Sequence, residues 1–184
     1  LVEKIAFTGG PETARHIIKN SSENLSEVSL ELGGKSPVAV FDDANQENAI
    51  NGITAGIFGA TGQSCIAGSR LYIQKGIYNE FLDKLSNRAS KIKIGAPMDP
   101  ETEMGPLSSF KQLEIIEKNI KETISQGGKL KCGGKRDSFS NEGYYFPPTI
   151  IECENHSLPA AENELFGPVL SVMKFDSEKD VINK

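Results

Sequence analysis

Short apolar segments rich in branched residues alternate along this chain with longer segments whose apolar residues recur at helical spacing. The runs VEKIAFT, SEVSLEL, SPVAVF and RLYIQ have the length and composition of strands. Helical spacing predicts one helix beginning at Pro11 and others over 78–94 and 108–126. Strands that alternate with helices predict an α/β fold with a mostly parallel sheet.

The segment after SPVAVFDD predicts a further helix, which ends at the glycines of GATG. Its apolar stripe includes Ile50, Ile53 and Ile57. Asp43 or Asn45 is the expected N-cap, because short polar side chains accept hydrogen bonds from the first exposed peptide N–H groups. The stretch GQSCIAG is thereby predicted to be a loop between this helix and the strand RLYIQ.

The composition narrows the class of protein. The 184 residues suffice for one domain with a sizeable core, and 38% hydrophobic with 24% charged residues is ordinary for a globular chain. The net charge is −5, and Lys and Arg are scattered among the acids. This argues against nucleic-acid and membrane-surface partners. The chain begins inside one predicted element and ends inside another, so we expect it to be a piece of a longer protein.

Cysteine and histidine usage argues against a metal site. The chain has three cysteines, Cys65, Cys132 and Cys153, and two histidines, His16 and His156, with no CxxC pair. An odd number of widely spaced cysteines also argues against a disulfide framework. We therefore predict no metal and a reducing, cytoplasmic setting.

The loop GATGQSCIAGSR raises the question of what Cys65 does. Small neighbours such as Ser64 and Gly68 leave room for a substrate, and peptide N–H groups of a bent loop can stabilise an oxyanion. Glu31, at the end of a predicted strand beside glycines, is the candidate general base. The alternatives are a small buried thiol and a solvated charge. Cys132 and Cys153 lie in or beside predicted strands and are interpreted as structural.

Gly9 and Gly10 stand between a predicted strand and a predicted helix. Such a turn directs peptide N–H groups at the positive end of the helix, where a phosphate can bind. The alternative is that the two glycines form an ordinary turn that binds no ligand.

Seven stretches occur here in the order found in the aldehyde dehydrogenase superfamily, which this chain resembles from about Phe7 to Phe175. The separation of Glu31 and Cys65, 65 − 31 = 34 residues, also resembles that of the family. The stretches are FTGG, LELGGKSP, GQSCIAGSR, MDPETEMGPL, GGKLKCGG, GYYFPPTI and ENELFGPV.

The resemblance implies oxidation of an aldehyde to a carboxylic acid with NAD or NADP. Cys65 would be the nucleophile that forms a thiohemiacetal and then a thioester, and Glu31 the base. A glutamate at this position favours the acid-forming type over the acylating type that uses coenzyme A. The resemblance also implies a set of cofactor-binding residues. These are Gly9, Gly10, Leu32, Gly33, Glu164 and Phe166.

The resemblance further implies a three-layer fold that is truncated at both ends. Residues 1–32 would end the NAD(P)-binding domain, and residues 33–184 would form an incomplete catalytic domain. A homodimer or homotetramer is expected of the whole protein, and no activity of this piece alone. Two other functions stay open: a non-catalytic or structural use of the same fold, and a thiol esterase.

Overall fold

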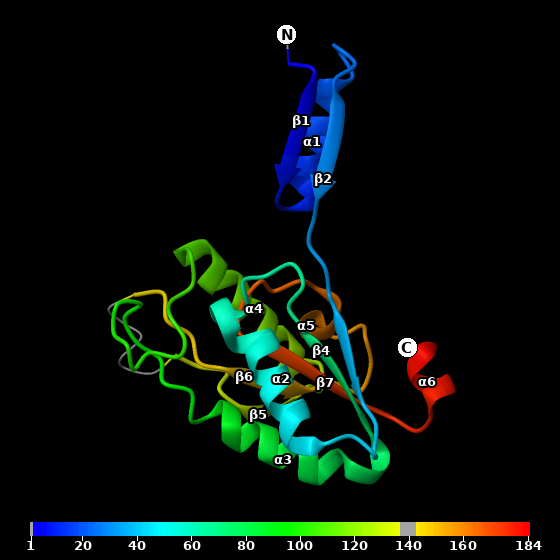
Figure 1. Cartoon of the computed structure of the whole chain (residues 1–184), viewed down its shortest axis with the longest axis vertical. Helices are drawn as coiled ribbons and strands as arrows, with labels where there is room; N and C mark the ends of the chain where they lie inside the picture. The colour runs from blue at the N-terminus through cyan, green and yellow to red at the C-terminus, as the bar shows by residue number, and fades with distance from the viewer. Residues whose placement is uncertain (1, 137–142) are drawn as a thin grey trace. The chain divides into compact units, whose positions relative to one another are not determined.

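A computed structural model describes residues 2–136 and 143–184 of the chain (Figure 1). It divides into two compact units, Leu1–Gly34 and Lys35–Lys184, and each is described by itself. The division lies close to the boundary placed after residue 32 from the sequence. The cofactor and catalytic roles assigned to the two parts remain predictions.

The first unit is a single β-α-β element. Strands β1 (Lys4–Thr8) and β2 (Glu27–Glu31) pair in parallel, and helix α1 (Pro11–Ser21) connects them (Figure 1). Alternate residues of both strands are half-buried, as the period of a strand with one covered face requires. Pro11 occupies the first turn of α1, where a missing N–H costs nothing.

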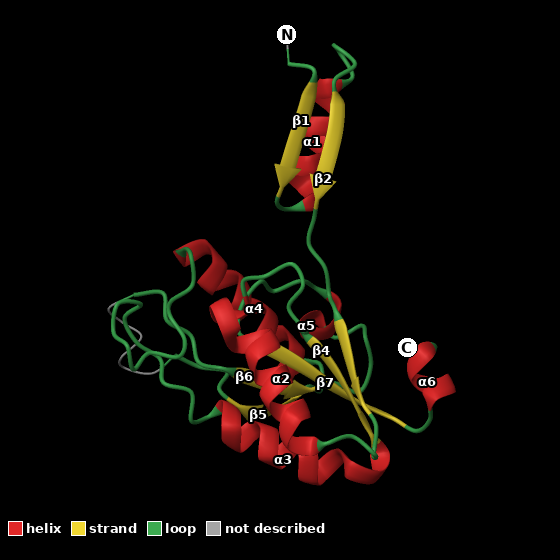
Figure 2. Cartoon of the chain, in the orientation of Figure 1, coloured by secondary structure: helices red, strands yellow, loops and turns green. Residues whose placement is uncertain are grey.

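The second unit is built on a five-stranded sheet in the order β3-β4-β7-β6-β5. Only the pairing of β5 with β6 is antiparallel, so the predicted α/β fold with a mostly parallel sheet is confirmed (Figure 2). The strands are β3 (Pro37–Val40), β4 (Arg70–Gln74), β5 (Lys129–Cys132), β6 (Thr149–Glu152) and β7 (Val169–Phe175).

Helices cover both faces of this sheet and make three layers. Helices α2 (Gln46–Phe58) and α3 (Tyr78–Ala89) share one apolar core with the sheet, and α4 (Phe110–Ser125) and α5 (Pro159–Glu162) share the other (Figure 1). Neighbouring residues of β4 point into different cores, since Leu71 belongs to the first and Tyr72 to the second. No helix among the described residues is long and apolar enough to cross a membrane.

The helix predicted over 78–94 is shorter than expected. Helix α3 ends at Ala89, although the apolar residues Ile92 and Ile94 continue its spacing. The backbone carbonyl of Lys93 accepts hydrogen bonds from the peptide N–H groups of Glu103 and Met104, at 2.8 and 3.1 Å. These bonds to a distant segment replace the helical ones, so the prediction was wrong beyond Ala89.

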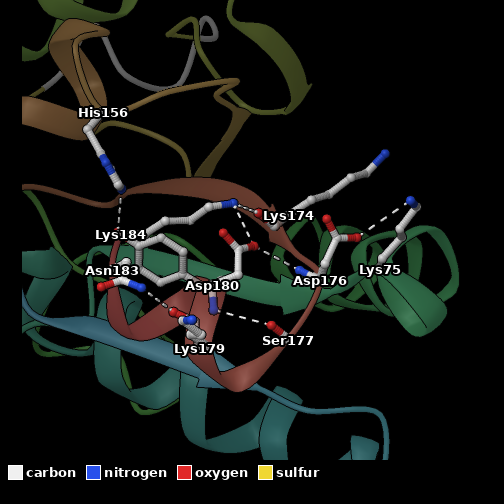
Figure 3. Close-up of polar contacts among 10 residues, drawn as sticks. Lys75, His156, Lys174, Asp176, Ser177, Lys179, Asp180, Asn183 and Lys184 are labelled. Atoms are coloured by element: carbon white, nitrogen blue, oxygen red, sulfur yellow. Dashed lines mark hydrogen bonds and ion pairs between the residues drawn. The ribbon is translucent and has the colours of Figure 1, made fainter.

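A short helix, α6 (Glu178–Ile182), follows β7 and is fixed by charged contacts (Figure 3). The Asp180 carboxylate accepts a hydrogen bond from the Asp176 N–H at 2.9 Å and lies 3.2 Å from the Lys184 ammonium. The Asp176 N–H, and after it Lys184, hold the pKa of Asp180 below its usual range. The Lys184 ammonium also donates to the Lys174 carbonyl at 2.6 Å, which ties the helix back to β7.

Asn45 is the N-cap of α2, because its side-chain oxygen accepts from the Asn48 N–H at 3.0 Å. We expect Asn45→Ala to lower the free energy of unfolding by about 1 kcal/mol, and Asn45→Ser to change it much less. Asn51→Ala is the matched control, since it changes an exposed asparagine inside the same helix and improves helix propensity. Urea denaturation measures all three, and an Asn45→Ala variant as stable as wild type would contradict the cap.

Candidate active site

Cys65 lies on an exposed turn between a 3-10 segment, Gly59–Gly62, and strand β4. The Ala67 N–H donates to the Ser64 carbonyl at 3.1 Å, which places Cys65 in the bend of the turn. Its thiol is free, and its side chain is exposed in this unit. This exposure argues against the alternative of a small thiol that fills the core.

The segment before Cys65 is anchored to the loop that precedes α4. The Thr61 hydroxyl donates to the Gly105 carbonyl at 3.1 Å. The Gln63 side-chain oxygen accepts from the Ser108 N–H at 2.8 Å. Thr61 also holds a left-handed backbone, with φ of 58°, which is uncommon for a branched residue. Strained backbone of this kind persists only where surrounding contacts fix it.

Gly62 makes a close approach to the loop that carries Glu164 and Phe166. A methyl group at Gly62 would lie 2.1 Å from the carbonyl oxygen of Gly167, closer than any real side chain comes. Gly62 also has a left-handed backbone, with φ of 67°. Two independent constraints therefore require glycine at position 62. The close approach places the segment before Cys65 against the loop that carries Glu164 and Phe166.

We call Asn163–Gly167 the cofactor loop, after its predicted role. Glu164 is exposed in it, and Phe166 is 39% exposed with an uncommon left-handed φ of 44°. The Gln112 side-chain amide donates to the Leu165 carbonyl and so anchors the loop to α4. Strained backbone at residues other than glycine clusters at functional sites.

The remaining predicted residues lie together in the first unit. Thr8 pairs with Glu31 at the ends of β1 and β2, and the Gly9 N–H donates to the Glu31 carbonyl at 3.0 Å. Glu31 is exposed, as are Leu32 and Gly33 directly after it. The structure thus places the two-glycine turn beside the predicted general base.

Gly10 is the N-cap of α1 and supplies no side-chain hydrogen bond to the start of the helix. An added side chain at Gly10 would meet nothing within 4 Å, so the helix start is open. An open helix N-terminus of this kind suits a phosphate group.

The two groups of predicted residues belong to different units. Gly9, Gly10, Glu31, Leu32 and Gly33 are described within the first unit. Cys65, Glu164 and Phe166 are described within the second. The pairing of the Glu31 carboxylate with the Cys65 thiol stays a prediction.

The other two cysteines have environments unlike that of Cys65. Burial raises the pKa of the Cys132 thiol, and it does the same to Cys153, whose residue is 5% exposed. A buried thiol with a raised pKa is a poor nucleophile because little of it is thiolate. Among the described residues, no group of three or more His, Cys, Asp or Glu side chains is arranged to hold a metal ion.

Two polar residues, His156 and Lys35, make contacts that the sequence does not predict. The His156 ring nitrogen Nε2 lies 2.7 Å from the Tyr72 hydroxyl, so His156 has a partner in β4 (Figure 3). Lys35, inside the motif LELGGKSP, donates from its ammonium to the Ala160 carbonyl at 2.8 Å. Both contacts join residues far apart in the chain, and no local pattern indicates them.

Comparison with known proteins gives a match over the whole chain. The model of the aldehyde dehydrogenase family matches residues 1–184. A (Z)-2-((N-methylformamido)methylene)-5-hydroxybutyrolactone dehydrogenase of Acinetobacter baylyi is 52% identical over 184 residues, which are 100% of this chain and 37% of that protein. A betaine aldehyde dehydrogenase of Mesorhizobium japonicum is 41% identical over 186 residues, 100% of this chain and 38% of that protein.

Solved structures agree with this match. Betaine aldehyde dehydrogenase from Staphylococcus aureus, in complex with NAD+, is 39% identical with a TM-score of 0.95, over 99% of this chain and 37% of that one. A mutant aldehyde dehydrogenase from Bacillus cereus is 40% identical with a TM-score of 0.94, over 98% of this chain and 36% of that one. The chain therefore spans between 36% and 38% of the length of these relatives.

The close approach of Gly62 to Gly167 predicts a large cost for Gly62→Ala. The added methyl group meets a backbone oxygen, and the left-handed backbone is unfavourable for alanine. We expect the free energy of unfolding to fall by about 2 kcal/mol or more.

Gly52→Ala is the matched control, because Gly52 lies inside α2 and an added methyl group there meets nothing within 4 Å. Alanine inside a helix is more favourable than glycine, so we expect stability to rise by roughly 0.5–1 kcal/mol. Chemical denaturation measures the free energy of unfolding of both variants. Equal stabilities for the two variants would contradict the described contact.

Proposed function

The chain belongs to the aldehyde dehydrogenase family. We propose that it is part of an NAD(P)+-dependent enzyme that oxidises an aldehyde to a carboxylic acid. The observation that carries the proposal is the position of Cys65. It is an exposed thiol on a fixed turn. Gly62, three residues before it, packs against the loop that carries Glu164 and Phe166. This packing supports the proposal that Cys65 acts on a ligand bound at that loop.

Cys65 is proposed to attack the aldehyde carbon as a thiolate, which forms a carbon–sulfur bond and turns the carbonyl oxygen into an oxyanion. Peptide N–H groups of the Ser64–Ala67 turn, that of Cys65 among them, would stabilise this oxyanion. The product of the step is a thiohemiacetal on Cys65. Because the attacking species is a thiolate, the proton of the thiol has to leave first.

Glu31 is proposed to accept that proton on its carboxylate. Glu31 would then release this proton to solvent. After the thiohemiacetal has been oxidised to a thioester, the regenerated carboxylate would take a proton from water. The resulting hydroxide equivalent attacks the thioester carbon, releases the carboxylic acid and restores the Cys65 thiol. A base that serves water favours an acid-forming enzyme over one that transfers the acyl group to coenzyme A.

Each unit, taken by itself, has residues that suit one part of a dinucleotide. The exposed ring of Phe166 suits a nicotinamide, the Glu164 carboxylate suits ribose hydroxyls, and the open start of α1 at Gly10 suits a pyrophosphate. Leu32 and Gly33 are proposed to line the nicotinamide, and Gly9 to lie under the pyrophosphate with Gly10. Bound NAD or NADP would accept the hydride that leaves the thiohemiacetal carbon.

The setting and assembly of the whole protein are also proposals. Three free cysteines support a reducing, cytoplasmic setting. We propose a homodimer or homotetramer with a small-molecule aldehyde as substrate. Since the chain covers about 37% of its relatives, we further propose that these 184 residues alone have no dehydrogenase activity.

Replacement of the nucleophile tests the proposed function. In the whole enzyme, formation of reduced cofactor from NAD+ or NADP+ is followed with a panel of aldehydes. We expect Cys65→Ser to lower kcat by roughly three orders of magnitude or more, because an alcohol of high pKa replaces the thiolate.

Cys132→Ser is the matched control and should keep most of the activity, because that thiol is half-buried and does not line the turn of Cys65. Dehydrogenase activity that survives in Cys65→Ser would exclude Cys65 as the nucleophile. Hydrolysis of esters without any cofactor, in an enzyme that oxidises no aldehyde, would instead support the thiol esterase.

A further inference from the structure

Helix α5 needs support from outside, because its four residues, Pro159–Glu162, are too few for a stable isolated helix. Three side chains hold its second residue, Ala160. The Ala160 carbonyl accepts from the Lys35 ammonium at 2.8 Å and from the Ser171 hydroxyl at 2.6 Å. The Ala160 N–H donates to the Thr123 hydroxyl at 2.9 Å. The backbone of one residue is thus joined to the segment before β3, to β7 and to α4.

The cofactor loop, Asn163–Gly167, begins where α5 ends. Any shift of α5 therefore moves Glu164 and Phe166. The loop has other anchors, since the Asn163 amide donates to the Asn119 side-chain oxygen at 3.1 Å. Among the three side chains that hold Ala160, however, only Lys35 carries a charge.

Lys35 is itself fixed and half-buried. Its carbonyl accepts from the Arg70 guanidinium at 2.8 Å, which ties its backbone to the first residue of β4. Burial lowers the pKa of the Lys35 ammonium to about 8, and the Arg70 guanidinium acts in the same direction. Cys153 and the Glu164 carboxylate act in the opposite direction and favour the charged form. An ammonium kept in such a place costs stability, which is a reason to look for a function.

We propose that Lys35 is a positioning residue for cofactor binding: through its hydrogen bond to the Ala160 carbonyl it fixes α5 and thereby the position of Glu164 and Phe166. The residue acts through α5 and does not itself contact the cofactor. This inference rests on the proposed function, because it takes the cofactor loop to bind NAD or NADP. Ser171 and Thr123 hold the backbone of the same residue with neutral hydroxyls, so among these three side chains only Lys35 makes the arrangement sensitive to pH.

The direction of the pH effect follows from the charge. Below about pH 8 Lys35 is protonated, and its ammonium donates a charge-assisted hydrogen bond to Ala160 and attracts the Glu164 carboxylate. Above that pH the neutral amine makes a weaker bond and no longer attracts Glu164. Affinity for the cofactor should therefore decrease as the pH rises through about 8.

The test measures the Kd of NAD+ in the whole enzyme by calorimetry, for wild type and three variants. Lys35→Met removes the donor and the charge but keeps the length, and we expect it to raise Kd roughly tenfold. Lys35→Arg keeps a permanent charge and should stay nearer to wild type and lose the change near pH 8. Lys91→Met alters an exposed lysine in the turn after α3 and should leave Kd unchanged.

A second measurement separates positioning from general stability. Since removal of an enclosed charge relieves a desolvation cost, we expect Lys35→Met to melt at or above the wild-type temperature while it binds NAD+ less tightly. Peptide N–H groups of residues 161–167 should exchange with deuterium faster in this variant, whatever the function of the loop. A lower melting temperature with unchanged Kd and exchange would overturn the proposal and leave Lys35 a structural residue.

The outcomes also distinguish this inference from the proposed function. A wild-type enzyme that binds NAD+ equally well from pH 7 to 9, with Lys35→Met equal to it, contradicts the positioning role alone. A wild-type enzyme that binds neither NAD+ nor NADP+ contradicts the proposed function, and with it the cofactor role of Lys35. If Lys35→Met does not fold, the pH dependence of wild-type affinity against that of Lys35→Arg still decides.

Discussion

The contact between Gly62 and the Gly167 carbonyl is the constraint on which the candidate site of the second unit depends. A backbone oxygen occupies the place where any other residue at position 62 would carry its side chain. The approach joins the segment that leads to Cys65 with the loop that carries Glu164 and Phe166. Hydrogen bonds from Thr61 and to Gln63 then fix the same segment from its other side.

Much of the fold could be predicted from local pattern, because alternation and helical spacing are properties of neighbouring residues. Successive residues of β4 enter different cores, as Leu71 and Tyr72 do, and the stripe of α2 at Ile50 and Ile53 packs against the sheet. The end of α3 could not be predicted, since distant peptide groups bind the Lys93 carbonyl and interrupt an apolar spacing that continues to Ile94. Helix α5 was missed because four residues are too few to show a period.

The candidate site could be predicted in part. Cys65 and Glu31 stand in short motifs that resemble a family, and the exposed turn of Cys65 agrees with its predicted role. The left-handed backbone of Phe166 and the bond from Lys35 to Ala160 left no signal in the sequence. Both depend on contacts between remote segments, which composition and periodicity do not report. No local pattern assigns Lys35 a role, although a half-buried ammonium is costly and therefore informative once its surroundings are known.

In the proposed reaction, Cys65 becomes acylated during turnover of the whole enzyme. The direct measurement mixes the whole enzyme with an aldehyde and NAD+, quenches it in acid within milliseconds, and maps the modified peptide by mass spectrometry. We expect the added mass of the acyl group on the peptide that contains Cys65, and its loss when water is given time to react. Acylation of Cys132 or Cys153, or oxidation of the aldehyde with no modified cysteine at any time, would contradict it.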